Sequence, residues 1–322
     1  MKILIVKCSA LGDIVHTYPV IDYLQKRHAP VSIDWAVDER CKELVESHPH
    51  IHQTISFGFK NSSLKKFFSS VQQLRKTKYD LIIDLQGNCK SGLLTLLAKG
   101  KKKIGFSYSH TAEWPNVLAT RERFTPPPHQ NIRDDYLSIV QQFFNDKELF
   151  TPSTIKLKSN SISDFNLKDT IVVAPGSRWP NKCLSEEKLK EILATFSSPF
   201  VFLWGNKEEK EVCQRLIDTV GGTLLPKLSL PQLQNLLQDT KLLVGMDSLP
   251  LHLAASIGTP TLSFFGPSSK NKYAPVGEQH TSYQGQCPYG IQFDKRCPKL
   301  RTCRTGACLK TTSSATESRP LL

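Results

Sequence analysis

Long apolar runs are missing from this sequence of 322 residues. None approaches the roughly 18 residues that a membrane-spanning helix needs. The first residues, MKILIVKC, contain an apolar stretch that is too short for a secretory signal, and no small-residue cleavage site follows. These absences predict a soluble protein of the cytoplasm.

Three ligand-binding patterns are missing as well. Neither of the two strand-to-helix turns that could bind a dinucleotide has G-x-G-x-x-G spacing, which disfavours an NAD-dependent oxidoreductase. No Asp-x-Asp pair is present to hold a metal-bound diphosphate, and no two cysteines have the two-residue gap of a zinc knuckle. Five of the nine cysteines are isolated, whereas a metal site stays open for the four near the end, Cys287, Cys297, Cys303 and Cys308.

Acidic residues are fewer than basic ones, with 29 Asp and Glu against 42 Lys and Arg and a net charge of +13. Eleven of the basic residues and only two Asp lie between Lys60 and Lys103. This local charge favours an anionic partner. A solvated lysine-rich face is the simpler alternative. From charge alone, a non-catalytic binder of nucleic acid or anionic lipid rivals an enzyme.

Short apolar runs alternate with helical patterns, which predicts βαβ units and parallel sheets. One helix is expected over residues 14–28, and the three prolines of RERFTPPPHQ should interrupt both patterns. The alternation restarts at TIVVAPG, and Ser185 is expected to open a helix there. We predict α/β domains over 1–165 and 166–308, with a disordered tail over 309–322.

The stretch SALGDIVHTYPV follows the first strand, KILIV, and places Ser9, Gly12, Asp13 and His16 near a single turn. This edge of an open α/β sheet is where ligands bind. Asp13 could take a proton from a hydroxyl group there. It could equally stabilise the start of a helix, where a negative charge is favourable.

Polar residues follow the strands of the second half in the same way. In APGSRWPNK, Gly176 and Ser177 make a tight turn, and Lys182 could meet a phosphate or be an ordinary solvated lysine. In LWGNKEEKE, Glu209 could accept hydrogen bonds from ribose hydroxyls or simply decorate a helix.

The most specific signal is GMDSLPLHLAASIGTP, where a strand ends and a helix begins. Asp247 and Ser248 stand at the expected N-cap, Pro250 lies in the first turn, and His252 follows. The free N–H groups of such a helix start can bind an anion. A capped helix with an incidental histidine is the alternative.

Together these motifs resemble the ADP-heptose lipopolysaccharide heptosyltransferases of glycosyltransferase family 9. The resemblance covers most of residues 1–308 and is greatest to the first, inner-core enzyme. The end of the chain, from Cys287 to Cys308, is more like the second heptosyltransferase, and TAEWPNVLATRERF lacks the arginine spacing of the first. The matching stretches are KCSALGDIVHTYPV, IDWAVDE, YDLIIDLQGNCKSGLL, KCLSEE, WGNKEE, LPKLSL, VGMDSLPLHLAAS and FFGPS.

The resemblance implies a GT-B fold, in which two Rossmann-like domains face a central cleft. It implies an inverting, metal-independent transfer from ADP-heptose to a Kdo–lipid A acceptor, with Asp13 as the base. No cofactor and no nucleic acid are implied, and the expected enzyme is a monomer at the cytoplasmic face of the inner membrane. The alternative acceptors are those of the second heptosyltransferase or a protein. The donor-binding residues that match the family are Lys182, Glu209, Asp247, Ser248, Leu249 and His252. From their position in the turn before Lys182, Gly176 and Ser177 are added to the donor site. From their position beside Asp13 or their charge, the expected acceptor-binding residues are Ser9, Gly12, Lys60, Lys65 and Lys66.

Overall fold

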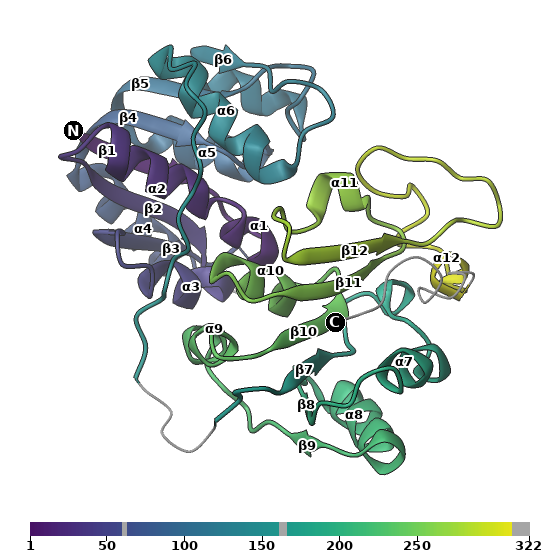
Figure 1. Cartoon of the computed structure of the whole chain (residues 1–322). Helices are drawn as coiled ribbons and strands as arrows, with labels where there is room; N and C mark the ends of the chain where they lie inside the picture. Colours follow the sequence, from purple (N-terminus) through teal and green to yellow (C-terminus); the bar gives the residue numbers. More distant parts are fainter. Residues whose placement is uncertain (60–62, 161–165, 311–322) are drawn as a thin grey trace. The chain divides into compact units, whose positions relative to one another are not determined.

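A computed structural model describes residues 1–59, 63–160 and 166–310 of the chain. The chain forms two compact units, Met1–Lys158 and a second that begins at Ser159 (Figure 1). The sequence prediction placed this boundary between residues 165 and 166.

The first unit is built on a parallel sheet with the strand order β3-β2-β1-β4-β5-β6. The central strands are almost completely buried, as expected for a parallel sheet covered on both faces. The strands are β1 (Lys2–Val6), β2 (Ser32–Asp38), β3 (Gln53–Phe57), β4 (Lys78–Asp84), β5 (Lys99–Phe106) and β6 (Glu122–Phe124). The helices are α1 (Leu11–Val15), α2 (Tyr18–Arg27), α3 (Lys42–Glu46), α4 (Leu64–Lys76), α5 (Cys89–Leu97) and α6 (Ile132–Phe144), with 3₁₀ turns η1 (Glu39–Cys41) and η2 (Trp114–Ala119).

The second unit repeats this plan, because its strand order is β12-β11-β10-β7-β8-β9 and all pairs are parallel. Numbered within each unit, both sheets have the doubly wound order 3-2-1-4-5-6. The strands are β7 (Ile171–Ala174), β8 (Phe200–Phe202), β9 (Thr223–Leu224), β10 (Leu242–Met246), β11 (Thr261–Phe265) and β12 (His280–Gln284). The helices are α7 (Glu186–Leu193), α8 (Lys207–Val220), α9 (Leu230–Leu237), α10 (Leu249–Ser256), α11 (Lys270–Tyr273) and α12 (Ala307–Lys310), with the 3₁₀ turn η3 (Pro180–Lys182).

Helices cover both faces of the second sheet. Ile171 and Val173 point to one face, where they pack with Leu189 of α7 and Leu216 of α8. Val172 points to the opposite face because side chains alternate along a strand. Figure 1 shows α9 and α10 on that other side. The carboxyl ends of the central strands are therefore left for the loops.

Three local features differ from the sequence prediction. The helix expected over 14–28 is split into α1 and α2, since Pro19 in the first turn of α2 cannot continue a helix from the preceding turn. Residues 122–124 of RERFTPPPHQ pair with β5 as an edge strand before the prolines end it. Leu309, assigned to the tail, lies in α12 and is buried in the core of the second unit. Residues 311–322 lie outside the described residues.

Ser185 caps α7 as predicted, because its hydroxyl accepts a hydrogen bond from the backbone N–H of Lys188. We expect Ser185→Ala to lower the free energy of unfolding by about 1 kcal/mol, the usual value of an N-cap. Urea denaturation of the full chain measures the change. Ser197→Ala, an exposed serine beyond the end of the same helix, should change it by less than about 0.5 kcal/mol. If the two substitutions lower the free energy of unfolding equally, the N-cap hydrogen bond of Ser185 does not contribute to stability.

Candidate active site

The predicted donor-binding residues lie at the switch point of the second sheet. Gly176 and Ser177 follow β7, while Asp247 and Ser248 follow β10. β7 and β10 are parallel neighbours, and the chain leaves them in opposite directions across the sheet. The Ser177 hydroxyl joins the two loops by donating to the backbone carbonyl of Asp247 over 3.5 Å. Open α/β sheets bind their ligands at such a point.

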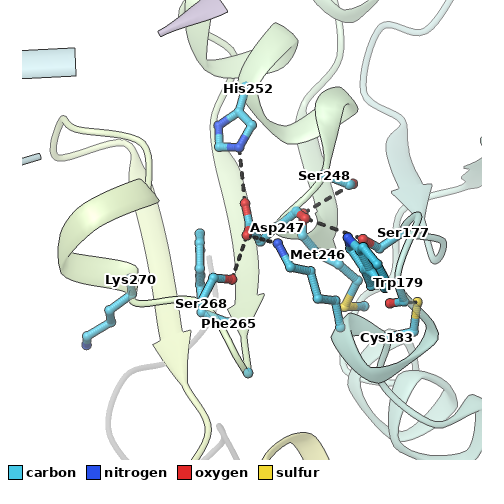
Figure 2. Close-up of polar contacts among 12 residues, drawn as sticks. Ser177, Trp179, Cys183, Met246, Asp247, Ser248, His252, Phe265, Ser268 and Lys270 are labelled. Atoms are coloured by element: carbon cyan, nitrogen blue, oxygen red, sulfur yellow. Dashed lines mark hydrogen bonds and ion pairs between the residues drawn. The ribbon is translucent and has the colours of Figure 1, made fainter. Parts of the chain in front are cut away.

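The Asp247 carboxylate is the centre of this site and contacts three side chains (Figure 2). Lys182 Nζ lies 2.5 Å from Oδ2. The Ser268 hydroxyl donates to the same oxygen over 2.5 Å. His252 Nε2 lies 3.2 Å from Oδ1. The cluster thus joins the loop after β7, the start of α10 and the loop after β11.

These contacts keep Asp247 ionised. Burial opposes the charge, but the hydrogen bond from His252 and the charges of Lys182 and His252 outweigh it, and the pKa of Asp247 lies well below its usual range. An ionised carboxylate only accepts hydrogen bonds, so Nε2 of His252 is the donor. The histidine is therefore held in a fixed orientation by the cluster and is not incidental.

The start of α10 differs from the capped helix that was the alternative. Ser248 has the backbone conformation of an N-cap, but its hydroxyl donates to the carbonyl of Met246 over 3.3 Å. The Asp247 carboxylate is engaged with Lys182, Ser268 and His252. No side chain of the described residues caps this helix, so the first N–H groups, beginning with Leu249, remain available to a ligand.

Glu209 lies at the same edge of the sheet, against the turn after β7. The Glu209 carboxylate accepts a hydrogen bond from the backbone N–H of Gly205 over 2.7 Å, and the backbone N–H of Glu209 donates to Asn206 Oδ1 over 2.8 Å. A Cβ atom built on Gly176 would lie 2.5 Å from Glu209 Oε1, a distance that real Cβ atoms do not show. Glycine at position 176 therefore leaves room for the Glu209 side chain against the turn after β7.

Two further residues support this site, Ser268 and Asn181, and neither was predicted from the sequence. Ser268 is fully buried and follows β11, which pairs with β10, so its position in FFGPS was the available signal. The Asn181 amide donates to the carbonyls of Leu300 and Cys303 over 2.7 and 3.2 Å and so fixes the turn that carries Lys182. No local pattern links residues so far apart in the chain.

The four cysteines near the end were left open as a metal site. Within the described residues, no group of three or more His, Cys, Asp or Glu side chains is arranged to hold a metal ion. Burial, and then the neighbouring Cys287 and Cys303, raise the pKa of Cys308 to about 11. The segment instead supports the loops around Asp247, since Cys297 N–H donates to the carbonyl of Pro267 and the carbonyl of Cys303 accepts from Asn181.

Asp13 lies in the first turn of α1, at the switch point of the first sheet. Its Oδ2 accepts from the backbone N–H of Ala10 over 3.0 Å, so the helix-stabilising role is real. Oδ1 makes no hydrogen bond within the described part of the chain, and the residue is partly exposed. Gln86, after β4, accepts from the N–H groups of Cys8 and Ser9 and ties the two central loops together.

Asp84, at the end of β4, was also missed. It is fully buried, and burial raises the pKa of its carboxyl group. Oδ1 accepts from the N–H groups of Gln86 and Gly87 over 2.9 and 3.0 Å, and Oδ2 accepts from the Asn116 amide over 2.7 Å. Asp84 therefore shapes the loop that positions Gln86 and, through it, the turn before Asp13.

The remaining acceptor-binding predictions are less well supported by contacts. Gly12 lies beside Asp13 in α1, whereas Lys65 and Lys66 are exposed on α4. Lys66 forms an ion pair with Glu39 at 2.5 Å. No hydrogen bond or ion pair within the described residues connects either lysine to Asp13, Ser9 or Gly12. Lys60 lies outside the described residues.

Comparison with known proteins identifies the family. The model of glycosyltransferase family 9 (heptosyltransferase) matches residues 67–302. The chain belongs to glycosyltransferase family 9. This glycosyltransferase is 27% identical over 297 residues to lipopolysaccharide heptosyltransferase 1 of Campylobacter coli, covering 85% of this chain and 86% of that protein. It is 25% identical over 290 residues to lipopolysaccharide heptosyltransferase 3 of Escherichia coli, covering 82% and 83%.

Among solved structures, the glycosyltransferase resembles the E. coli heptosyltransferase WaaC with ADP-2-deoxy-2-fluoro heptose. The TM-score is 0.78 at 23% identity, over 96% of this chain and 98% of that one. The expected α/β fold of two parallel-sheet units of the GT-B class is therefore confirmed.

Asp247→Asn keeps the shape of the side chain and removes its charge. At neutral pH we expect the free energy of unfolding to fall by about 3 kcal/mol, because the buried Lys182 ammonium loses its counter-ion. The folded-state pKa of Asp247 is lowered, so its contribution is complete above the unfolded pKa of about 3.9 and is lost as the pH falls below it.

The difference in the free energy of unfolding between wild type and Asp247→Asn should therefore become smaller in acid. Urea denaturation across the pH range measures this difference. Asp239→Asn, an exposed carboxylate of the same unit, is the control and should differ little from wild type at any pH. A gap that is constant with pH would show that the lost charge is not the cause.

Proposed function

We propose that this glycosyltransferase transfers heptose from ADP-L-glycero-D-manno-heptose to the Kdo and inner-core region of lipopolysaccharide. The observation that carries the proposal is the buried Lys182–Asp247–His252 cluster beside the uncapped start of α10. The Lys182 ammonium and free N–H groups at one switch point suit a diphosphate. The names of the relatives support the sugar and the acceptor class.

The donor is proposed to bind wholly at the second unit. Lys182 and the N–H groups at the start of α10, including that of Leu249, would contact the diphosphate. Ser177 and Gly176 line the same turn, and His252 is held toward it by Asp247. The Glu209 carboxylate would accept hydrogen bonds from the ribose hydroxyls.

The chemistry would be a single displacement with inversion. Asp13 takes the proton of an acceptor hydroxyl, whose oxygen attacks the anomeric carbon of the heptose. The bond between that carbon and the phosphate oxygen breaks, and ADP leaves with the electron pair. Lys182 and the start of α10 would stabilise the charge that builds on the diphosphate. No step in this scheme uses a metal ion.

An acceptor of lipid A type would bring the enzyme to the cytoplasmic face of the inner membrane as a peripheral protein, and we propose that it acts there as a monomer. Within the described residues, no helix has the length and apolar character that crossing a bilayer requires.

A second candidate function is transfer of heptose to another acceptor. It is supported by the identity to a lipopolysaccharide heptosyltransferase 3, which is similar to the identity to a heptosyltransferase 1. Purified protein incubated with ADP-heptose and Kdo2–lipid A should release ADP. Release only with a different acceptor would support the second candidate.

Asp13→Asn tests the proposed base. The amide oxygen can still accept from Ala10 N–H, so the variant should fold and bind ADP as wild type does. Loss of the base should slow transfer by about 10² to 10⁴. ADP release under saturating substrates measures the rate, and calorimetric titration with ADP checks donor binding. Activity within a few-fold of wild type would leave Asp13 only its role in α1.

A second test separates the substrates. Lys182→Gln and His252→Ala should each weaken ADP binding, because both side chains belong to the cluster of the second unit. The reversal Lys65→Glu with Lys66→Glu should raise the acceptor KM, less so at high salt, and leave ADP affinity unchanged. Thermal unfolding confirms that each variant is folded. If the reversal weakens ADP as much as the acceptor, the proposed division between the units is wrong.

A further inference from the structure

Large apolar side chains are exposed in one region of the first unit. Eleven such side chains are exposed within the described residues, and seven of them fall between Leu64 and Leu118. Scattered exposed leucines are ordinary, but a gathered set marks an interaction surface. The seven are Leu64, Phe68, Leu93, Leu96, Tyr108, Trp114 and Leu118, with exposed fractions from 46% to 77%.

The exposed residues of α4 border α5. Leu64, Phe68 and Arg75 share one flank of α4, since they are separated by four and seven residues. The Arg75 guanidinium donates to the backbone carbonyl of Leu97 at the end of α5 over 2.9 Å. This flank is therefore the side of α4 that faces α5.

The exposed residues of α5 continue the same surface. Leu93 lies one turn before Leu97, which packs into the core cluster together with Phe67 of α4. Leu96 lies one turn after Gly92, and a Cβ on that glycine would be 3.3 Å from Cα of Asn116 in η2. α5 is thus flanked by α4 on one side and by η2, with Trp114 and Leu118, on the other. We call the exposed residues of these three elements the α4–α5–η2 surface: Leu64, Phe68, Leu93, Leu96, Trp114 and Leu118.

Positive charge is concentrated in the part of the sequence that carries this apolar surface. From residue 63 to residue 103 the sequence has ten Lys and Arg and two Asp. Asp84 is fully buried, and Asp80 pairs with Lys101 at 2.7 Å. Glu113, at the edge of η2, accepts from the backbone N–H of Cys89 over 2.8 Å. Within the described residues, most of these cations therefore have no carboxylate partner. The exceptions are Lys66 with Glu39, Lys101 with Asp80 and Lys102 with Glu122 at 3.8 Å.

We propose that the α4–α5–η2 surface docks the enzyme on an anionic lipid bilayer. The leucines and Phe68 would enter the headgroup boundary, Trp114 has the amphipathic ring typical of that boundary, and the lysines would contact lipid phosphates. A second copy of the chain fits poorly, because a symmetric contact would press these cations against one another. The inference rests on the proposed function only for the lipid nature of the acceptor.

Flotation of the full chain with lipid vesicles tests the proposal without any substrate. Wild type should bind phosphatidylglycerol-containing vesicles, lose affinity as salt is raised, and bind phosphatidylcholine vesicles weakly. Leu93→Ser with Leu96→Ser should weaken binding at least about tenfold. Lys65→Gln should weaken it about fivefold. The matched control, Leu149→Ser with Val276→Ser, removes two exposed apolar side chains elsewhere and should bind as wild type does.

A second readout uses Trp114, whose indole is 60% exposed. Its fluorescence should shift to the blue with anionic vesicles and be quenched by brominated lipid, and Trp114→Phe should abolish both changes. The proposal is overturned if wild type ignores anionic vesicles or if the α5 double variant binds them normally. It is also overturned if sedimentation shows a dimer that the double variant dissociates. ADP release is assayed separately, so failure here leaves the proposed reaction untouched.

Discussion

The site of the second unit depends on the charge of one carboxylate, that of Asp247. Lys182 is buried, and a buried ammonium without a counter-ion is costly or loses its proton. Asp247 supplies that counter-ion and also holds Ser268 and His252. The loop after β7 and the loop after β11 are therefore both tied to the start of α10 by the same pair of oxygen atoms. Neutralising Asp247 would weaken both of these links and the contact with His252 at once.

The strand order of the sheets explains why the polar residues meet where they do. In each unit the two central strands send the chain to opposite sides, which leaves room between their loops. The first unit uses this position for Asp13, with Gln86 tying the loops together, and the second uses it for Asp247. The same strand order thus presents one oxygen of the Asp13 carboxylate in the first unit and the Lys182 ammonium, paired with Asp247, in the second.

The sequence was sufficient for features that depend on neighbouring residues. Alternating apolar runs predicted the parallel sheets, and the residues after β7 and β10 were identified because strand ends share one edge. What it could not predict are contacts between distant segments, such as Asn181 with Cys303 or Ser268 with Asp247. The sequence predicted Asp247 at a helix cap, which is a local role. In the structure its carboxylate instead pairs with Lys182, which the fold brings close from another part of the chain. The apolar periodicity of residues 14–28 continues through Pro19 and predicted one helix. Proline cannot continue a helix from the preceding turn, so the structure has two helices there.

Pairing with Asp247 is compatible with the ligand-binding role proposed for Lys182. A lysine ammonium has three N–H donors, and Asp247 accepts one of them. The remaining donors can contact a phosphate while the carboxylate keeps the ammonium charged and in place. A preformed pair of this kind lowers the entropy lost on binding, since the long side chain is already ordered. The uncapped N–H groups of α10 are fixed by the helix in the same way, so a diphosphate would meet donors that need little rearrangement.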